Sequence, residues 1–242
     1  MLLGALFLLT LSALYYLRLY RHPLVRRLST EPAGLLRLPP GELPRADKLL
    51  RRVRRLESIL SQAGVRGPTL AAALEHPAQS AEARCRALAG RLGAESQPVA
   101  VGLWQVKLGD NFPLNLTECL LCLPEFNEPA PAVLAQLEAS PEAAEGVIVI
   151  LHPDEAEQEK LHQAVDDPGN LYVAPEPAGV TALLLSPDPV TVLARLISAQ
   201  IRLTRISPYR TGGGAGRESM FFGRGQLIAH VMNREPAKCC AR

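Results

Sequence analysis

The sequence predicts an α/β protein that has an N-terminal transmembrane helix, a basic helical stalk, a small and mainly parallel sheet domain, and a C-terminal linker. Three observations support this prediction. Residues 1–17 contain no charged side chain, residues 21–70 are rich in arginine, and segments of strand and helix character alternate over residues 96–203. The predicted regions are a transmembrane anchor (1–20), a basic juxtamembrane region (21–95), an α/β domain (96–203), and a linker with the truncated start of a further module (204–242).

The first twenty residues, MLLGALFLLTLSALYYLRLY, place leucine and alanine on every face of a helix. A secretory signal peptide carries its positive charge before the apolar run, whereas here Arg18 follows it. Tyr15 and Tyr16 stand where interfacial aromatic residues are found, and the positive-inside rule places the arginines in the cytoplasm. We therefore expect an uncleaved single-pass anchor in the cytoplasmic (inner) membrane, with the N-terminus outside and the bulk of the chain in the cytoplasm. The alternative is the buried N-terminal helix of a soluble protein.

Charge is distributed unevenly along the 242 residues. Residues 1–70 carry a net charge of +8 and residues 71–242 carry −6, for a total of +2. A basic region beside an apolar segment favours an anionic lipid surface as its partner. Nucleic acid is disfavoured, because the basic region has no interleaved aromatic residues and matches no nucleic-acid-binding module. The five cysteines, at irregular spacing, indicate reduced thiols in the cytosol rather than a disulfide framework.

In the juxtamembrane region, five prolines between residues 21 and 45 predict a linker. A helix is predicted from Arg45 to Ala63, with an apolar stripe on one face and arginines around the other. Such a helix can rest on anionic lipid headgroups, or it can be an ordinary packed helix with a solvated charged face. A further helix is predicted from Ser80, as its N-cap, to Leu92. The predicted membrane-surface residues are Arg18, Arg21, Arg26, Arg27, Arg51, Arg52, Arg54 and Arg55.

Short apolar runs alternate with amphipathic segments in the α/β region, which predicts helices on both sides of a sheet. The predicted strands are Val99–Val106, Thr117–Leu123, Val147–Leu151 and Leu171–Ala174. The predicted helices are Ala132–Leu137, Asp154–Val165 and Pro189–Leu203. Thr181–Leu185 is compatible with either a strand or a helical turn.

Three polar residues, His152, Asp154 and Glu155, follow the predicted strand Val147–Leu151. Ligands of open α/β sheets bind beyond the carboxyl ends of the strands, so this edge is the candidate site of a small enzyme. The alternative is that Asp154 caps the next helix, and no catalytic residue is assigned. Cys119 and Cys122 form a CxxC pattern, but residues three apart in a strand point to opposite faces. This pattern predicts buried thiols, and no metal site is assigned.

The C-terminal region opens with Gly212–Ser219 (GGGAGRES), which lacks the lysine of a phosphate loop and is typical of a flexible linker. The C-terminal region contains the string ISPYRTGGGAGRESMFFGRGQLIAHVMNR. It resembles the entry segment of bacterial signalling ATPases of the STAND or AAA-like kind, where a Pro-Tyr or Pro-Phe linker leads to an F-x-G-R-E turn and then a helix. Gly225 stands where that family usually has glutamate.

The resemblance covers about residues 204–236 and implies that three residues, Phe222, Gly223 and Arg224, would flank ATP in a longer protein. It also implies that this chain is the N-terminal part of a longer ATPase, ending before the phosphate loop. We expect no cofactor for this fragment, and ATP only for the longer parent.

Together these features favour a membrane-anchored cytoplasmic sensor or adaptor region of a signalling ATPase, non-catalytic as it stands. It would act by conformational coupling, with the bilayer and unidentified proteins as partners. One alternative is a small membrane-tethered enzyme that uses the sheet edge at His152, Asp154 and Glu155. The other is a scaffold that binds lipid and protein through the arginine-rich helix.

Overall fold

A computed structural model describes residues 10, 12, 14–109, 112–114, 116–165 and 171–201. Within these residues the chain forms one mixed sheet with the strands side by side in chain order. The strands are β1 (Glu95–Ala100), β2 (Leu103–Lys107), β3 (Glu118–Cys122), β4 (Ile148–Ile150) and β5 (Tyr172–Val173). The first three strands pair antiparallel, and β3, β4 and β5 pair parallel. The prediction of a mainly parallel sheet is therefore wrong.

The physical reason is a hairpin that the apolar pattern conceals. Val99–Val106 is predicted as a single strand, but the chain turns back at Val101 and Gly102. Gly102 has a φ of 71°, a left-handed conformation that glycine adopts without the steric cost of a side chain. A tight turn of this kind joins antiparallel neighbours, whereas parallel strands need a longer crossover.

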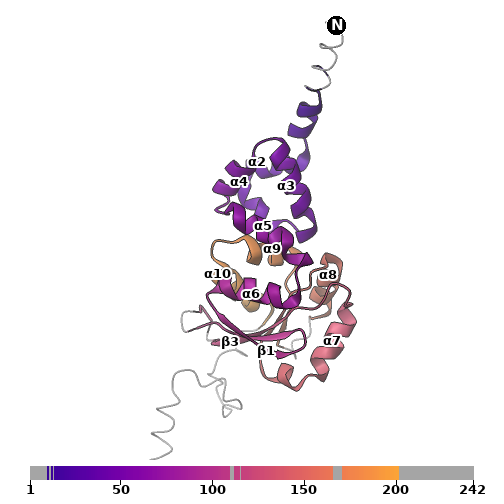
Figure 1. The fold of residues 1–242 in the computed structure, drawn as a ribbon, viewed down its shortest axis with the longest axis vertical. Coiled ribbons are helices and arrows are strands. Elements are labelled where there is room, and N and C mark those ends of the chain that lie inside the picture. The colour runs from indigo at the N-terminus through magenta and orange to yellow at the C-terminus, as the bar shows by residue number, and fades with distance from the viewer. Residues whose placement is uncertain are drawn as a thin grey trace, which may run out of the picture.

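Helices cover both faces of the sheet (Figure 1). One face packs on α7 (Ala130–Ala139) and α8 (Glu155–Ala164), through an apolar cluster that includes Leu120 and Ile150. The other face, which includes Leu121, packs in a larger cluster. Of the helices in that cluster, α6 (Ala81–Leu92) packs on β1, α10 (Pro189–Gln200) packs on β5, and α9 (Pro177–Leu185) packs on α10. Thr181–Leu185 is thus part of a helix, and its residues are buried all round.

A layer of short helices lies beyond α9, on the side away from the sheet (Figure 1). Its elements are α2 (Pro23–Thr30), η1 (Pro32–Arg37), η2 (Pro40–Glu42), α3 (Leu43–Arg52), α4 (Leu56–Gln62), α5 (Gly67–Glu75) and η3 (His76–Ala78). The linker predicted over residues 21–45 is wrong, because the prolines begin helices there. Pro23, Pro32 and Pro40 each occupy a first helical position, where the missing N–H costs no hydrogen bond.

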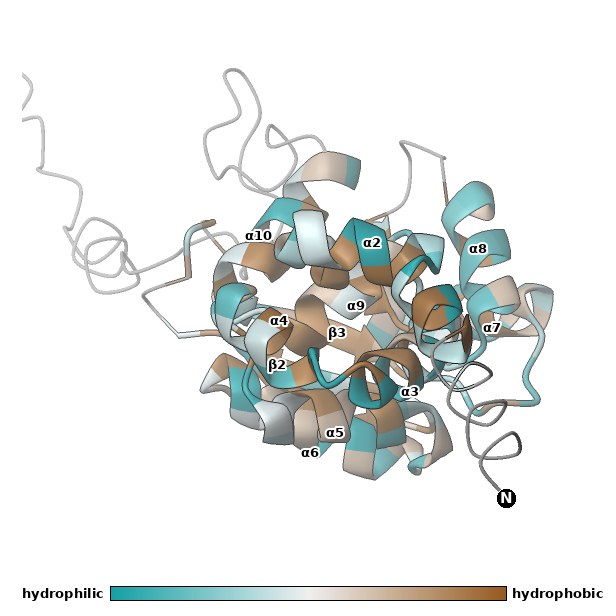
Figure 2. Cartoon of the chain, turned by 90° about the horizontal axis from the view of Figure 1, so that it is seen from above, coloured by the Kyte–Doolittle hydropathy of each residue, from teal (hydrophilic) through white to brown (hydrophobic). Residues whose placement is uncertain are grey.

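The helix predicted from Arg45 to Ala63 is broken into α3 and α4. Arg54 takes a left-handed conformation with a φ of 54°, and the N–H of Arg55 donates to the carbonyl of Leu50. The apolar stripe nevertheless faces the core, since Leu50 and Val53 are buried before the break and Leu56 after it. In Figure 2 hydrophilic and hydrophobic residues alternate along these helices.

No helix among the residues that the structure describes is long and apolar enough to cross a membrane. The predicted transmembrane helix, and the single-pass localisation that depended on it, are therefore wrong. Residues 14–20 are helical. The tyrosines of this segment contact the helical layer: Tyr20 donates to the carbonyl of Val53 at 3.3 Å, and Arg52 donates to Tyr15 at 3.3 Å. Residues 1–9, 11 and 13 lie outside the described residues.

Substitution of glycine by alanine should have opposite effects on stability at two positions. A Cβ at Gly179 of α9 would lie 2.9 Å from Cδ2 of Leu196 and 3.3 Å from Cβ of Pro175. Gly179→Ala should therefore lower the free energy of unfolding by about 1–3 kcal/mol through overpacking. Gly90 of α6 is exposed and has open space around its Cβ position, so Gly90→Ala should raise stability by about 0.5–1 kcal/mol. Urea unfolding of both variants tests the pair, and equal signs would contradict the close approach of α9 and α10.

Candidate functional site

An open cavity of about 440 Å³ lies beyond the carboxyl ends of β3 and β4, opposite the start of α6. Its size is within the range of about 300–1,000 Å³ that is usual for small-ligand sites. This edge of a parallel strand pair is also where ligands of open α/β sheets bind. The lining residues are Pro77, Ala78, Gln79, Ser80, Arg84, Glu125, Phe126 and Pro153.

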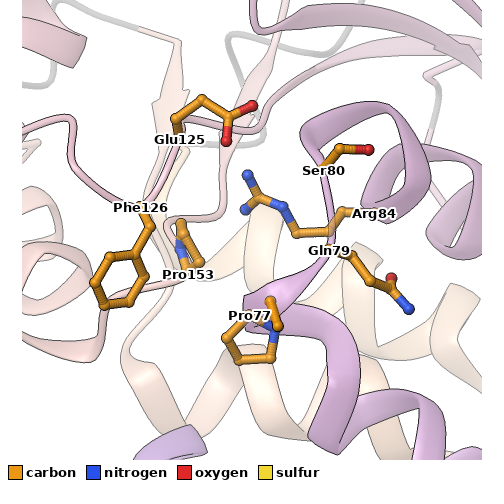
Figure 3. Close-up of a pocket in the computed structure, with 8 residues that line it drawn as sticks. Pro77, Gln79, Ser80, Arg84, Glu125, Phe126 and Pro153 are labelled. Carbon is orange, nitrogen blue, oxygen red and sulfur yellow. The ribbon is translucent and has the colours of Figure 1, made fainter.

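Arg84 is the buried charge of this cavity. Its side chain points from α6 toward the loop after β3, with Glu125, Phe126 and Pro153 across from it (Figure 3). The residue has no exposed area. Its Nη2 donates to the carbonyls of Leu123, at 3.4 Å, and Pro124, while Nε and Nη1 have no hydrogen-bond partner. Burial lowers the pKa of Arg84, and the charge of Glu125 opposes this change.

The local sequence explains why the guanidinium lies at this place. Ser80 caps α6, because its Oγ accepts a hydrogen bond from the N–H of Ala83 at 3.3 Å. Arg84 is one turn into this twelve-residue helix, on the same face as the buried Ala81 and Leu88. The side chain therefore lies near the helix N-terminus, whose dipole also favours a negative charge. The two positive features act in the same direction on any anion that enters the cavity.

His76 lies just before the cavity-lining residues Pro77 and Ala78. It is 5% exposed, and its Nε2 has no hydrogen-bond partner. Burial, followed by the positive charge of Arg84, lowers the pKa of His76 to about 4. The ring is therefore neutral at neutral pH, and protonation would place a second positive charge close to Arg84.

The structure does not bring the predicted edge residues together around the cavity. His152 is buried and donates from Nε2 to the carbonyl of Glu128 at 2.8 Å, while its Nδ1 accepts from the N–H of Asp154. The carboxylate of Asp154 caps α8 by accepting from the N–H of Ala156 at 2.8 Å. Glu155 accepts from the N–H of Gly41 at 2.9 Å. Each of the three thus has a structural partner, which favours the helix-cap alternative for Asp154.

Sequence reasoning selected the edge of the sheet at which this cavity lies, but it missed Arg84. The residue stands among other charged residues of α6 and looks like part of a solvated face. The signal that identifies it is its spacing: Arg84 is three residues after Ala81 and four before Leu88, which are both buried. A charged residue in an apolar helical stripe is buried when the helix packs through that stripe.

The two cysteines of the CxxC pattern point to opposite faces of the sheet, which confirms the prediction from their spacing. Cys122 packs in the cluster with α7 and α8, and Cys119 in the cluster with α6, α9 and α10. Burial raises the pKa of each thiol to about 12, so neither is a nucleophile at neutral pH. Within the described residues no three His, Cys, Asp or Glu side chains gather as metal ligands.

The remaining predicted site residues fall in two groups. The arginines assigned to a membrane surface are all exposed, at positions 18, 21, 26, 27, 51, 52, 54 and 55. Arg51 is paired with Asp47 at 2.8 Å, and Arg55 lies over the ring of Tyr20. Phe222, Gly223 and Arg224 lie outside the described residues.

No protein-family model, curated protein or solved structure matches the chain.

Proposed function

We propose that this chain is the non-catalytic sensory region of a signalling ATPase, and that its sheet domain binds a small anionic ligand at Arg84. The observation that carries the proposal is a fully buried guanidinium with Nε and Nη1 unpartnered beside an open cavity. Leaving a buried donor unpaired costs about 1–3 kcal/mol, and more for a charged group. A ligand that supplies carboxylate or phosphate oxygens recovers this cost, since arginine binds both in a planar, bidentate geometry.

The ATPase part of the proposal rests on the resemblance of residues 204–236 to the entry segment of that family. In this view Phe222, Gly223 and Arg224 lead into the nucleotide-binding module of a longer protein. The sheet domain precedes that segment in the chain, so a change in the sheet domain is transmitted along the linker. No chemical step is assigned to the described residues.

Access to Arg84 supplies the conformational signal. Because the guanidinium has no exposed area, a ligand reaches it only when the side chains of Glu125 and Phe126, on the loop after β3, turn aside. Glu125 and Phe126 of this loop are exposed, whereas its far end is held in place. The carbonyl of Glu128 accepts a hydrogen bond from Nε2 of His152, and the N–H of Ala130 donates to the carboxylate of Glu157 at 2.8 Å. Binding and this side-chain movement are then one event, and the ligand stabilises the rearranged state by its higher affinity for it.

The test measures binding of two anionic probes, 4-methylpentanoate and inorganic phosphate, to the full chain by calorimetry at fixed ionic strength. At least one should bind Arg84, and 4-methylpentanoate should bind about tenfold or more tightly than the uncharged 4-methylpentanamide. Arg84→Met should remove binding. Arg86→Met, at an exposed position two residues along α6, should leave it unchanged.

Failure of both probes to bind the wild-type chain would overturn the proposal. So would equal affinity for 4-methylpentanoate and its amide, because the guanidinium would then contribute nothing. If Arg84→Met does not fold, Arg84→Lys replaces it, since lysine keeps the charge but loses the bidentate geometry. The comparison of the carboxylate with its amide needs no variant.

A further inference from the structure

We propose that the ligand is an α-amino acid with an apolar side chain, whose carboxylate binds Arg84 and whose ammonium group binds Glu125. The proposal rests on the proposed function, because it names the ligand of the same cavity. It follows from three features: two opposite charges that share the cavity, the free state of the Glu125 carboxylate, and the apolar composition of the remaining walls.

The first feature is the pair of charges. Arg84 and Glu125 both line the cavity, one from α6 and the other from the loop after β3 (Figure 3). The charge of Glu125 acts on Arg84, yet the two form no ion pair within 4 Å among the described residues. A simple anion at Arg84 would be repelled by Glu125. A ligand with one negative and one positive group a short distance apart satisfies both side chains.

The second feature is the state of Glu125. Its backbone N–H donates to Glu128, but in the described part of the chain its carboxylate takes part in no hydrogen bond or ion pair. The residue is exposed, so an ammonium group that enters from solvent can reach it. An ionised carboxylate that accepts hydrogen bonds from an ammonium group makes a charge-assisted contact of about twice the usual strength.

The third feature is the apolar wall. Pro77, Ala78, Phe126 and Pro153 line the cavity, and the Phe126 side chain is left 54% exposed. Covering an exposed aromatic ring with apolar surface is favourable, because it removes the area of the ring from water. A branched aliphatic or aromatic side chain on the ligand provides this cover. A purely polar amino acid would bind the two charges and leave Phe126 exposed.

The experiment compares four related probes on the full chain by calorimetry. L-leucine carries both charges, 4-methylpentanoate lacks the ammonium group, L-leucinamide lacks the carboxylate, and glycine lacks the apolar side chain. L-leucine should bind about tenfold or more tightly than each of the other three, because each lacks one of the three contacts.

Substitution at Glu125 separates the two charges. Glu125→Gln should weaken L-leucine about tenfold, while 4-methylpentanoate binds equally well or more tightly because a repulsive charge is gone. Glu138→Gln makes the same change of charge at an exposed position on α7 and should leave both affinities unchanged.

The outcomes distinguish this inference from the proposed function. If L-leucine binds no more tightly than 4-methylpentanoate, the amino-acid inference is overturned while the anion site at Arg84 stands. If L-leucinamide matches L-leucine, the carboxylate contact is absent and the inference also fails. If none of the probes binds, including 4-methylpentanoate and inorganic phosphate, both proposals fail together.

Discussion

Leu121→Ala should lower the free energy of unfolding by about 2–5 kcal/mol. Leu121 is in β3, the strand that joins the antiparallel and parallel halves of the sheet, and it is 1% exposed. The substitution removes buried methyl groups and leaves a cavity that the surrounding helices and strands cannot fully close. Because β3 also leads to the carbonyls that hold Arg84, the loss should be accompanied by weaker ligand binding.

Urea unfolding followed by circular dichroism measures this change. The control is Val101→Ala in the turn between β1 and β2, where the side chain is 86% exposed. That variant should stay within about 0.5 kcal/mol of the wild type. A similar loss in both variants would mean that β3 is not at the centre of the core.

His76 should make the protein less stable as the pH falls from about 6.5 to about 4. In the folded chain burial lowers the pKa of His76 to about 4, whereas in the unfolded chain the ring takes up its proton near pH 6.5. The unfolded state therefore binds more protons between these values, and unfolding is favoured by acid. The free energy of unfolding therefore has its full value, as far as His76 is concerned, above pH 6.5. It falls by about 3 kcal/mol as the pH approaches 4.

His76→Leu removes the titrating group and tests this expectation. Its free energy of unfolding should change less with pH over this window than that of the wild type. Above pH 7 the two proteins should show the same slope of free energy of unfolding against pH. Val101→Ala, at an exposed position, removes no titrating group and should keep the wild-type slope. An unchanged slope in His76→Leu would show that the ring gains no charge on unfolding.

Periodicity predicted the segments whose apolar pattern is continuous. Asp154–Val165 and Ser80–Leu92 correspond closely to α8 and α6, because each has a polar N-cap and one apolar face. The pattern does not record where a chain changes direction. Gly102 makes a hairpin out of one predicted strand, and Arg54 makes two helices out of one, since both residues adopt left-handed backbone conformations. A positive φ at arginine has no signature in the sequence.

The candidate site could be predicted only in part from the sequence. The carboxyl edge of the strands could be predicted, because the order of strand, loop and helix indicates where parallel strands end. The side chains that line the cavity could not be predicted, since one wall is formed by α6, a helix that precedes the whole sheet in the chain. Only the fold places Arg84 against Leu123 and Pro124, about forty residues later.

The continuous core also has a consequence for how the protein is made. The apolar cluster that contains Val25 and Leu35 also contains Leu185 and Leu193, and α9 packs directly on η1 and α5. Because α2 and η1 precede α9 and α10 in the chain, they are synthesised before the helices that complete their core. Until then their apolar faces stay uncovered, which is a state prone to aggregation during synthesis. Separation of the chain after residue 95 would leave both pieces in this state, so expression of residues 1–95 alone should give insoluble protein.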